Sequence, residues 1–217
     1  MHREKVSPRS GWQQRLEKLG FDFYTLDGKA YWTEQACYVF TSSQIDEVEA
    51  ATDELHGLCL KAVEHVVANG LWERMRIPAG GGESMGGGWR RSDRTIAAGF
   101  DLAYDGRNPP KLLEYNADTP TALYEAAVVQ WYWLKDVKPE ADQFNSIHEK
   151  LIDAWRGILR RLPPEAMVHF ARFEDQPEDF ATSEYLRDTA LQAGLAGKPL
   201  AVSQIGWNGK RSHSGRR

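Results

Sequence analysis

The sequence has few cysteines, no long apolar run and no strong excess of one charge. Its two cysteines, Cys37 and Cys59, indicate reduced thiols in a cytoplasmic protein rather than a disulfide framework. No apolar run approaches the length of a bilayer span, and the first residues lack the apolar region of a signal peptide. A net charge of −4 produces no field that favours nucleic acid or an anionic membrane. We therefore expect a cytoplasmic protein that acts on small molecules, without nucleic-acid or membrane partners.

The composition is that of a globular protein: the 217 residues are 41% hydrophobic and 27% charged, enough for a sizeable core. Apolar spacing and turn residues predict a mixed α/β chain. The predicted helices are Arg9–Gly20, a long one from Thr41–Gln44 to about Asn69, Ala122–Lys135, Asn145–Leu162 and Ser183–Ala193; the predicted late strands are Met167–Phe173 and Pro199–Ile205. Strand, helix and strand in that order indicate a parallel crossover unit.

Two local features carry further predictions about the first half of the chain. The segment Thr41–Gln44 offers an N-cap for the long helix, and Glu47 is placed to complete the capping arrangement. The segment Gly80–Gly88 contains six glycines in nine residues, which are costly to order. It also lacks the Gly-Lys-Ser/Thr ending of a phosphate-binding loop, so it is predicted to be a flexible linker.

The stretch Phe100–Thr121 has the pattern of an antiparallel hairpin. Two apolar-rich runs, Phe100–Tyr104 and Lys111–Tyr115, flank the six turn-forming residues Asp105–Pro110. Proline cannot donate to a strand ladder, so all six residues are assigned to the loop.

This assignment fixes a register in which Tyr104 lies opposite Lys111 and Asp101 opposite Glu114, with Asn116 on the same face. Two like charges about 5 Å apart at an effective dielectric of about 20 repel by roughly 3 kcal/mol. A divalent cation with oxygen ligands relieves that repulsion, and so does exposure of the acidic face to solvent. On spacing alone, the exposed acidic face is the simpler interpretation.

The phrase LLEYNADTPTALYEA (Leu112–Ala126) resembles the glutathionylspermidine synthase family, which are ligases of the ATP-grasp type. The resemblance continues in Gly20–Tyr38, Ile77-Pro78, Phe100–Gly106 and Asp142–Trp155, and it covers most of the chain up to about Gly206. It implies an incomplete ATP-grasp-like architecture over residues 1–206. The expected parts are amino-terminal helices, a central antiparallel hairpin that carries metal ligands, and a strand–helix–strand unit.

The resemblance also implies the site residues. Magnesium ligands of the family fall on Asp101, Glu114 and Asn116, and contacts to a glutathione-like substrate fall on Thr119 and Thr121. The N-terminus of the following helix, around Thr119–Thr121, is expected to point at the ligand and to attract anions. Gly99 departs from the family pattern, which has an arginine near the transferred phosphate; Arg90, Arg91 and Arg94 are the nearby replacements. The glycine-rich segment is a second departure. No catalytic residue is assigned.

The implied reaction uses ATP and Mg²⁺. ATP phosphorylates the glycine carboxylate of a glutathione-like thiol peptide, and a polyamine then displaces phosphate to form an amide. Family members continue beyond Gly206 with the lobes that clamp ATP, so we expect a truncated chain without turnover alone, ending in a disordered basic tail at 207–217. The alternative is a non-catalytic fragment that binds a divalent cation or a peptide-like ligand, or that needs a separately encoded remainder.

Overall fold

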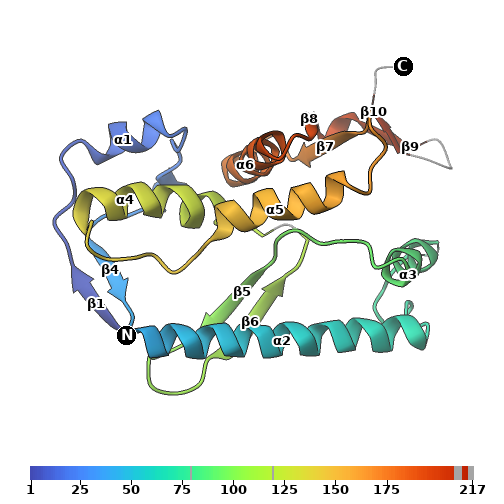
Figure 1. The fold of residues 1–217 in the computed structure, drawn as a ribbon, viewed down its shortest axis with the longest axis horizontal. Helices are drawn as coiled ribbons and strands as arrows, with labels where there is room; N and C mark the ends of the chain where they lie inside the picture. Colours follow the sequence, from blue (N-terminus) through green and yellow to red (C-terminus); the bar gives the residue numbers. More distant parts are fainter. Residues whose placement is uncertain (79, 119, 208–211, 215–217) are drawn as a thin grey trace. The chain divides into compact units, whose positions relative to one another are not determined.

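The computed structural model describes residues 1–78, 80–118, 120–207 and 212–214, as a mixed α/β chain of helices and two-stranded sheets (Figure 1). The chain forms two compact units. Unit 1 comprises Met1–Arg3 and Tyr38–Ala117, and unit 2 comprises Glu4–Cys37 and Asp118–Arg217. None of the helices in the described residues is long and apolar enough to cross a bilayer.

Unit 1 contains the long helix α2 (Ser42–Ala68), which begins as the sequence indicates but is capped differently. The hydroxyl of Thr41 accepts the Gln44 backbone N–H at 3.3 Å, and the Gln44 side chain accepts the Thr41 N–H at 3.0 Å. The capping partner is therefore Gln44, and the prediction for Glu47 was wrong. Glu47 instead accepts a hydrogen bond from the Tyr104 hydroxyl at 2.6 Å.

The glycine-rich segment is a helix, α3 (Gly81–Arg90), so the prediction of a flexible linker was wrong. Gly82 and Gly86 are buried because the indole of Trp72 lies against them. A Cβ atom on Gly82 would lie 2.6 Å from Trp72 Cγ. Trp89 on the same helix donates its indole N–H to the Glu64 carboxylate of α2. These tertiary contacts offset the entropy that the glycines lose on ordering.

Unit 2 has an aromatic core near its amino-terminal end. The residues Leu16, Phe21, Phe23, Val129 and Ala181 form one buried cluster. Helix α1 (Trp12–Lys18) supplies Leu16, and the rings of Phe21 and Phe23 lie with their centroids 4.3 Å apart.

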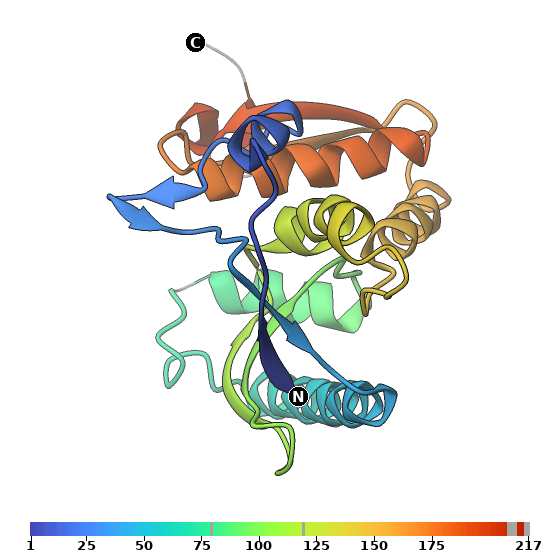
Figure 2. The ribbon, with the colours of Figure 1, turned by 90° about the vertical axis from the view of Figure 1, so that its left-hand side faces the viewer.

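A small hairpin of β2 (Thr25–Leu26) and β3 (Lys29–Ala30) follows this core in the chain (Figure 2). The turn between these strands is Asp27-Gly28, with φ angles of 50° and 74°. Positive φ at both central residues is the requirement of a type I′ hairpin turn, and Asp-Gly meets it. Strands β1 (His2–Lys5) and β4 (Ala36–Val39) pair as a further two-stranded sheet.

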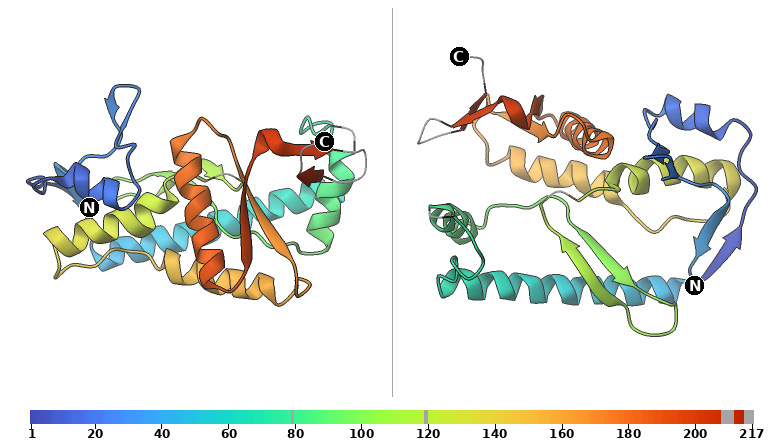
Figure 3. Two further views of the ribbon diagram at one scale, coloured as in Figure 1. Left: turned by 90° about the horizontal axis from the view of Figure 1, so that it is seen from above. Right: turned by 180° about the vertical axis from the view of Figure 1, so that it is seen from behind.

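The parallel crossover predicted for the last third is confirmed. Strands β7 (Met167–Arg172) and β8 (Ala196–Ala201) pair in parallel, and α6 (Pro177–Gln192) connects them (Figure 3, left). Helix α5 (Ile147–Leu159) packs against this crossover through Trp155. The indole of Trp155 contacts the ring of Phe170 on β7 and donates its N–H to the Thr189 hydroxyl on α6 at 3.1 Å.

The element boundaries of this crossover differ from the predicted ones. Helix α6 starts at Pro177, six residues before the expected start, because proline suits the first helical position. Strand β8 ends at Ala201 and is followed by a short 3₁₀ helix, Val202–Gln204.

The carboxyl end also differs from the expected unstructured tail. Strand β9 (Ile205–Trp207) pairs antiparallel with β10 (Ser212–Ser214). The rest of the predicted tail, 208–211 and 215–217, lies outside the described residues.

The packing of Trp72 on α3 predicts opposite effects for two glycine substitutions. Gly82→Ala should lower the free energy of unfolding by about 1–3 kcal/mol, because the new methyl group overlaps the indole. Gly87→Ala should raise it by about 0.5–1 kcal/mol, because its Cβ meets only the end of the Arg91 side chain and alanine favours the helix. Urea denaturation followed by circular dichroism measures both. A stabilised Gly82→Ala variant would contradict this account of α3.

Candidate functional site

The central hairpin is present in unit 1 as β5 (Gly99–Ala103) and β6 (Lys111–Asn116), which run antiparallel (Figure 1). Asp101 is the register partner of Glu114, as the sequence predicts. Asn116 is the partner of Gly99, one pleat further along the same ladder. Since side chains two residues apart share a face, the hairpin places the acidic pair and the amide on one side.

The register near the loop was predicted wrongly. Ala103, not Tyr104, lies opposite Lys111, and the register shifts between Asp101 and Leu102. Leu113 is the extra residue of this β-bulge, and its side chain is 70% exposed. The bulge adds one residue to β6, so the slip at the loop does not reach the acidic pair.

The other face of the hairpin is attached to α2. Phe100 and Tyr115 stack across the strands with centroids 4.0 Å apart, and the Tyr115 hydroxyl lies 2.8 Å from Nδ1 of His56. Tyr104 adds the bond to Glu47 already described. With this face occupied by aromatic contacts to the helix, Asp101 and Glu114 are exposed on the opposite face.

The polar face has the chemistry of an oxygen-rich cation site. The Asn116 amide donates to Oε1 of Glu114 at 3.4 Å, which brings these two side chains together. Within the described residues, neither Asp101 nor Glu114 forms an ion pair with a lysine or arginine. The described residues also contain no group of three His, Cys, Asp or Glu side chains suited to a metal. The candidate set therefore consists of two carboxylates and one amide.

The loop that closes the hairpin is held by its own aspartate. Oδ1 of Asp105 accepts the backbone N–H groups of Asn108 at 2.8 Å and Arg107 at 2.9 Å, and Oδ2 accepts the Asn108 side chain at 2.7 Å. Gln44 at the start of α2 donates to the Gly106 carbonyl at 2.8 Å. The loop thereby fixes one end of the hairpin to the helix.

The resemblance predicts substrate contacts at two threonines that lie outside the hairpin. Thr119 lies outside the described residues, and Thr121 is exposed in an irregular segment of unit 2. The helix expected to begin around Thr119–Thr121 begins later, because Ala122 has a left-handed φ of 61° that a continuous helix does not accept. Leu123 and Tyr124 are the first helical residues, and the helix continues as a π-helix, Glu125–Val129, and then as α4 (Gln130–Val137).

Glu125 at the start of this π-helix is buried, and its carboxylate accepts the Tyr31 hydroxyl at 2.7 Å. Burial and that bond raise the pKa of Tyr31. Sequence spacing gave no sign of this pair, because the two residues lie far apart in the chain.

Gly99, the position that the resemblance matches to an arginine, lies opposite Asn116 in the ladder and contributes backbone only. Arg91, one of the suggested replacements, is held by Asp93 at 2.6 Å. Arg94 is exposed, and Arg90 ends α3.

Comparison with known proteins decides the ancestry of this arrangement. Residues 3–215 match the family described as glutathionylspermidine synthase preATP-grasp. The chain belongs to this family. The match includes the hairpin, the parallel crossover and the whole of the described aromatic core.

Individual relatives are similar over most of this chain. A Haemophilus influenzae protein named as an acid–amine ligase is 39% identical over 201 residues, which cover 90% of this chain and 51% of that protein. The bifunctional glutathionylspermidine synthetase/amidase of Escherichia coli is 26% identical over 184 residues, covering 79% and 28% respectively. The trypanothione synthetase of Crithidia fasciculata is 28% identical over 193 residues, covering 86% and 26%. The preATP-grasp chain thus spans about half, or less, of the length of these relatives.

The hairpin loop predicts a carboxyl group that titrates unusually low. Hydrogen bonds from the Asn108 backbone and side chain, and then from the Arg107 backbone, lower the pKa of Asp105 from 3.8 to about 2. Because the pKa is lower in the folded state, the ionised Asp105 carboxyl stabilises the fold. This stabilisation is fully present above pH 3.8 and is lost as the pH falls through about 2.

An NMR titration of the Asp105 carboxyl carbon should have its midpoint near pH 2. Asn108→Ala removes the side-chain donor and should move the midpoint upward. A wild-type midpoint at the ordinary value would contradict the described loop.

Proposed function

We propose that this chain supplies the magnesium-binding and acyl-substrate-binding part of an ATP-dependent acid–amine ligase. One observation carries the proposal: Asp101 and Glu114 are register partners on a hairpin whose opposite face is fixed to α2, with Asn116 bonded to Glu114. Among the described residues no lysine or arginine forms an ion pair with these carboxylates, so both are available to a bound cation, which would offset their repulsion.

The donor set fits magnesium. Mg²⁺ takes oxygen ligands, commonly one or two carboxylates, and completes its shell with water and substrate phosphate. Asp101 and Glu114 supply the carboxylates, and the Asn116 amide turns its oxygen to the site by rotation about its last side-chain bond. When bound, the ion neutralises negative charge on phosphate oxygens during phosphoryl transfer.

The hairpin itself does the positioning. Its aromatic face holds the strands on α2 through Tyr115–His56 and Tyr104–Glu47, so the three ligands are presented from a regular sheet rather than from a loop. Sites on regular elements hold their geometry more closely than sites on loops. Gly99 contributes backbone only, so charge stabilisation at its place in the ladder falls to the cation.

For the substrates, we propose a glutathione-like thiol peptide as the acyl donor, contacted by Thr119 and Thr121, and a polyamine as the acceptor. Support comes from the LLEYNADTPT phrase and from the names of two relatives, a glutathionylspermidine synthetase and a trypanothione synthetase. We assign the protein to the cytoplasm, where such substrates and ATP occur together, because both of its cysteines are free.

The competing function is a cation-binding or peptide-binding module without turnover, and Gly99 is the observation that favours it. Loss of a positive charge beside the transferred phosphate removes transition-state stabilisation while leaving the oxygen ligands in place. The ligase and the cation-binding module both require the cation site. They differ in whether the complete protein forms an amide.

Replacing one carboxylate tests the metal assignment. Glu114→Gln should weaken Mg²⁺ binding about ten-fold or more, because it removes a charged oxygen ligand. Mn²⁺ serves as the paramagnetic probe: it should broaden the amide signals of β5 and β6 in the wild type, and Mg²⁺ should reverse the broadening by competition.

The matched control is Glu49→Gln, which makes the same change on the exposed side of α2 and should leave the Mg²⁺ affinity unchanged. If the acidic face binds no cation, the expected result differs. Glu114→Gln then raises the melting temperature, because it relieves the repulsion from Asp101, and the cation affinity is the same in both variants. That result would remove the metal site.

A further inference from the structure

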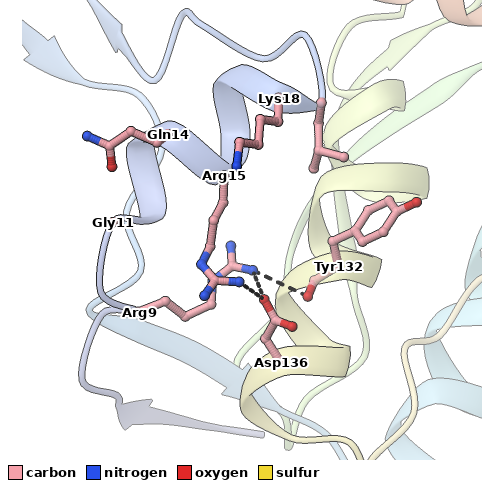
Figure 4. Close-up of a pocket in the computed structure, with 8 residues that line it drawn as sticks. Arg9, Gly11, Gln14, Arg15, Lys18, Tyr132 and Asp136 are labelled. Atoms are coloured by element: carbon pink, nitrogen blue, oxygen red, sulfur yellow. Dashed lines mark hydrogen bonds and ion pairs between the residues drawn. The ribbon is translucent and has the colours of Figure 1, made fainter.

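A second polar site lies in unit 2, beside α1. A cavity of about 550 Å³ is lined there by Arg9, Gly11, Gln14, Arg15, Lys18, Leu19, Tyr132 and Asp136. Figure 4 shows the guanidinium groups of Arg9 and Arg15 meeting at the carboxylate of Asp136, while the ring of Tyr132 points away from them. The site shares no residue with the hairpin and belongs to the other compact unit.

The base of this cavity is a buried charged side chain. The Arg9 side chain is 8% exposed, and its Nε lies 3.1 Å from Oε2 of Glu34, whose side chain is fully buried. Its Nη1 donates to Oδ2 of Asp136 at 2.7 Å and to the Tyr132 carbonyl at 3.3 Å. Three acceptor groups, the two carboxylates and the Tyr132 carbonyl, thus fix the guanidinium plane, so the base of the site is preorganised.

The rim carries cations that are less constrained. Arg15 donates from Nη1 to the same Asp136 oxygen at 3.2 Å, and its side chain is 54% exposed. Lys18, one turn further along α1, is exposed, has no side-chain partner among the described residues, and extends toward Arg15 in Figure 4. Three cations face two carboxylates, so the site has one surplus positive charge that no described side chain neutralises.

We propose that this cavity binds a small oxyanion, a carboxylate or a phosphate, between Arg15 and Lys18 above Arg9. The guanidinium of Arg15 and the ammonium of Lys18 are the donors that such oxygens take in charge-assisted hydrogen bonds. In the free protein, Asp136 accepts a hydrogen bond from Arg15 and so competes with the ligand for this guanidinium group. Binding moves Arg15 from Asp136 to the oxyanion, and Arg9 keeps Asp136 in place.

This arrangement predicts opposite signs for two charge-removing substitutions. Lys18→Gln should weaken oxyanion binding about ten-fold, because one charge-assisted bond is lost. Asp136→Asn should strengthen binding about three-fold or more, because the repulsion and the competition for Arg15 are both reduced. Lys150→Gln, an exposed lysine of the same unit on α5, is the matched control and should change nothing.

The experiment titrates inorganic phosphate and, separately, succinate into the isotopically labelled chain at constant ionic strength, followed by amide chemical shifts of α1 and α4. Saturable shifts with phosphate alone assign the site to phosphate-type ligands, and saturable shifts with succinate alone assign it to carboxylates. Melting temperatures of each variant show whether the fold is retained.

Three results would overturn the proposal. The first is the absence of saturable shifts with either anion. The second is equal weakening by Lys18→Gln and Lys150→Gln, which indicates unspecific charge attraction. The third is weaker binding in a folded Asp136→Asn variant, which shows that Asp136 does not compete. Mg²⁺ binding at the hairpin is measured independently, so neither test decides the other.

Discussion

The candidate chemistry of this chain depends on one unfavourable contact, the placement of two carboxylates directly opposite each other across an antiparallel ladder. Such a pairing destabilises a sheet, because like charges at directly opposite positions repel. In this hairpin the pairing is supported from the other face. Phe100 stacks on Tyr115, and two tyrosine hydroxyls bond to α2, so the strands cannot slip to separate Asp101 from Glu114 without breaking these contacts.

Local sequence signals predicted those features that local chemistry decides. The N-terminus of α2 at Thr41 and the antiparallel hairpin follow from turn and capping preferences of a few adjacent residues. The parallel crossover of β7, α6 and β8 follows from the alternation of element types. The pairing of Asp101 with Glu114 was also predicted correctly. The predicted register holds at this pair, and it is off by one residue between the bulge and the loop.

Other features could not be read from neighbouring residues. The helix α3 looked like a linker because its glycines are poor helix formers, and the indole of Trp72 that packs on them comes from outside the segment. The delayed helix start after Thr121 depends on the backbone of Ala122, where alanine gives no hint of a left-handed conformation. The ion network around Arg9 joins three separate segments, so no spacing rule reveals it.

The family membership and the geometry support each other at different levels. Similarity over nearly the whole chain shows the family, and the β5–β6 ladder shows that Asp101 and Glu114 lie opposite each other. Gly99 is where the two differ: the proposed ligands Asp101, Glu114 and Asn116 meet on the hairpin, whereas the position that the resemblance matches to an arginine contributes backbone only.

Because of the bulge at Leu113, the length of the connection between the strands does not determine on which face Glu114 lies. In an unbroken ladder, adding or deleting one residue in the connection between the strands turns every later side chain to the wrong face. A residue that is looped out of the pleat absorbs that change before it reaches Glu114. In this hairpin the length of the connection can therefore change by one residue while Asp101 and Glu114 remain register partners.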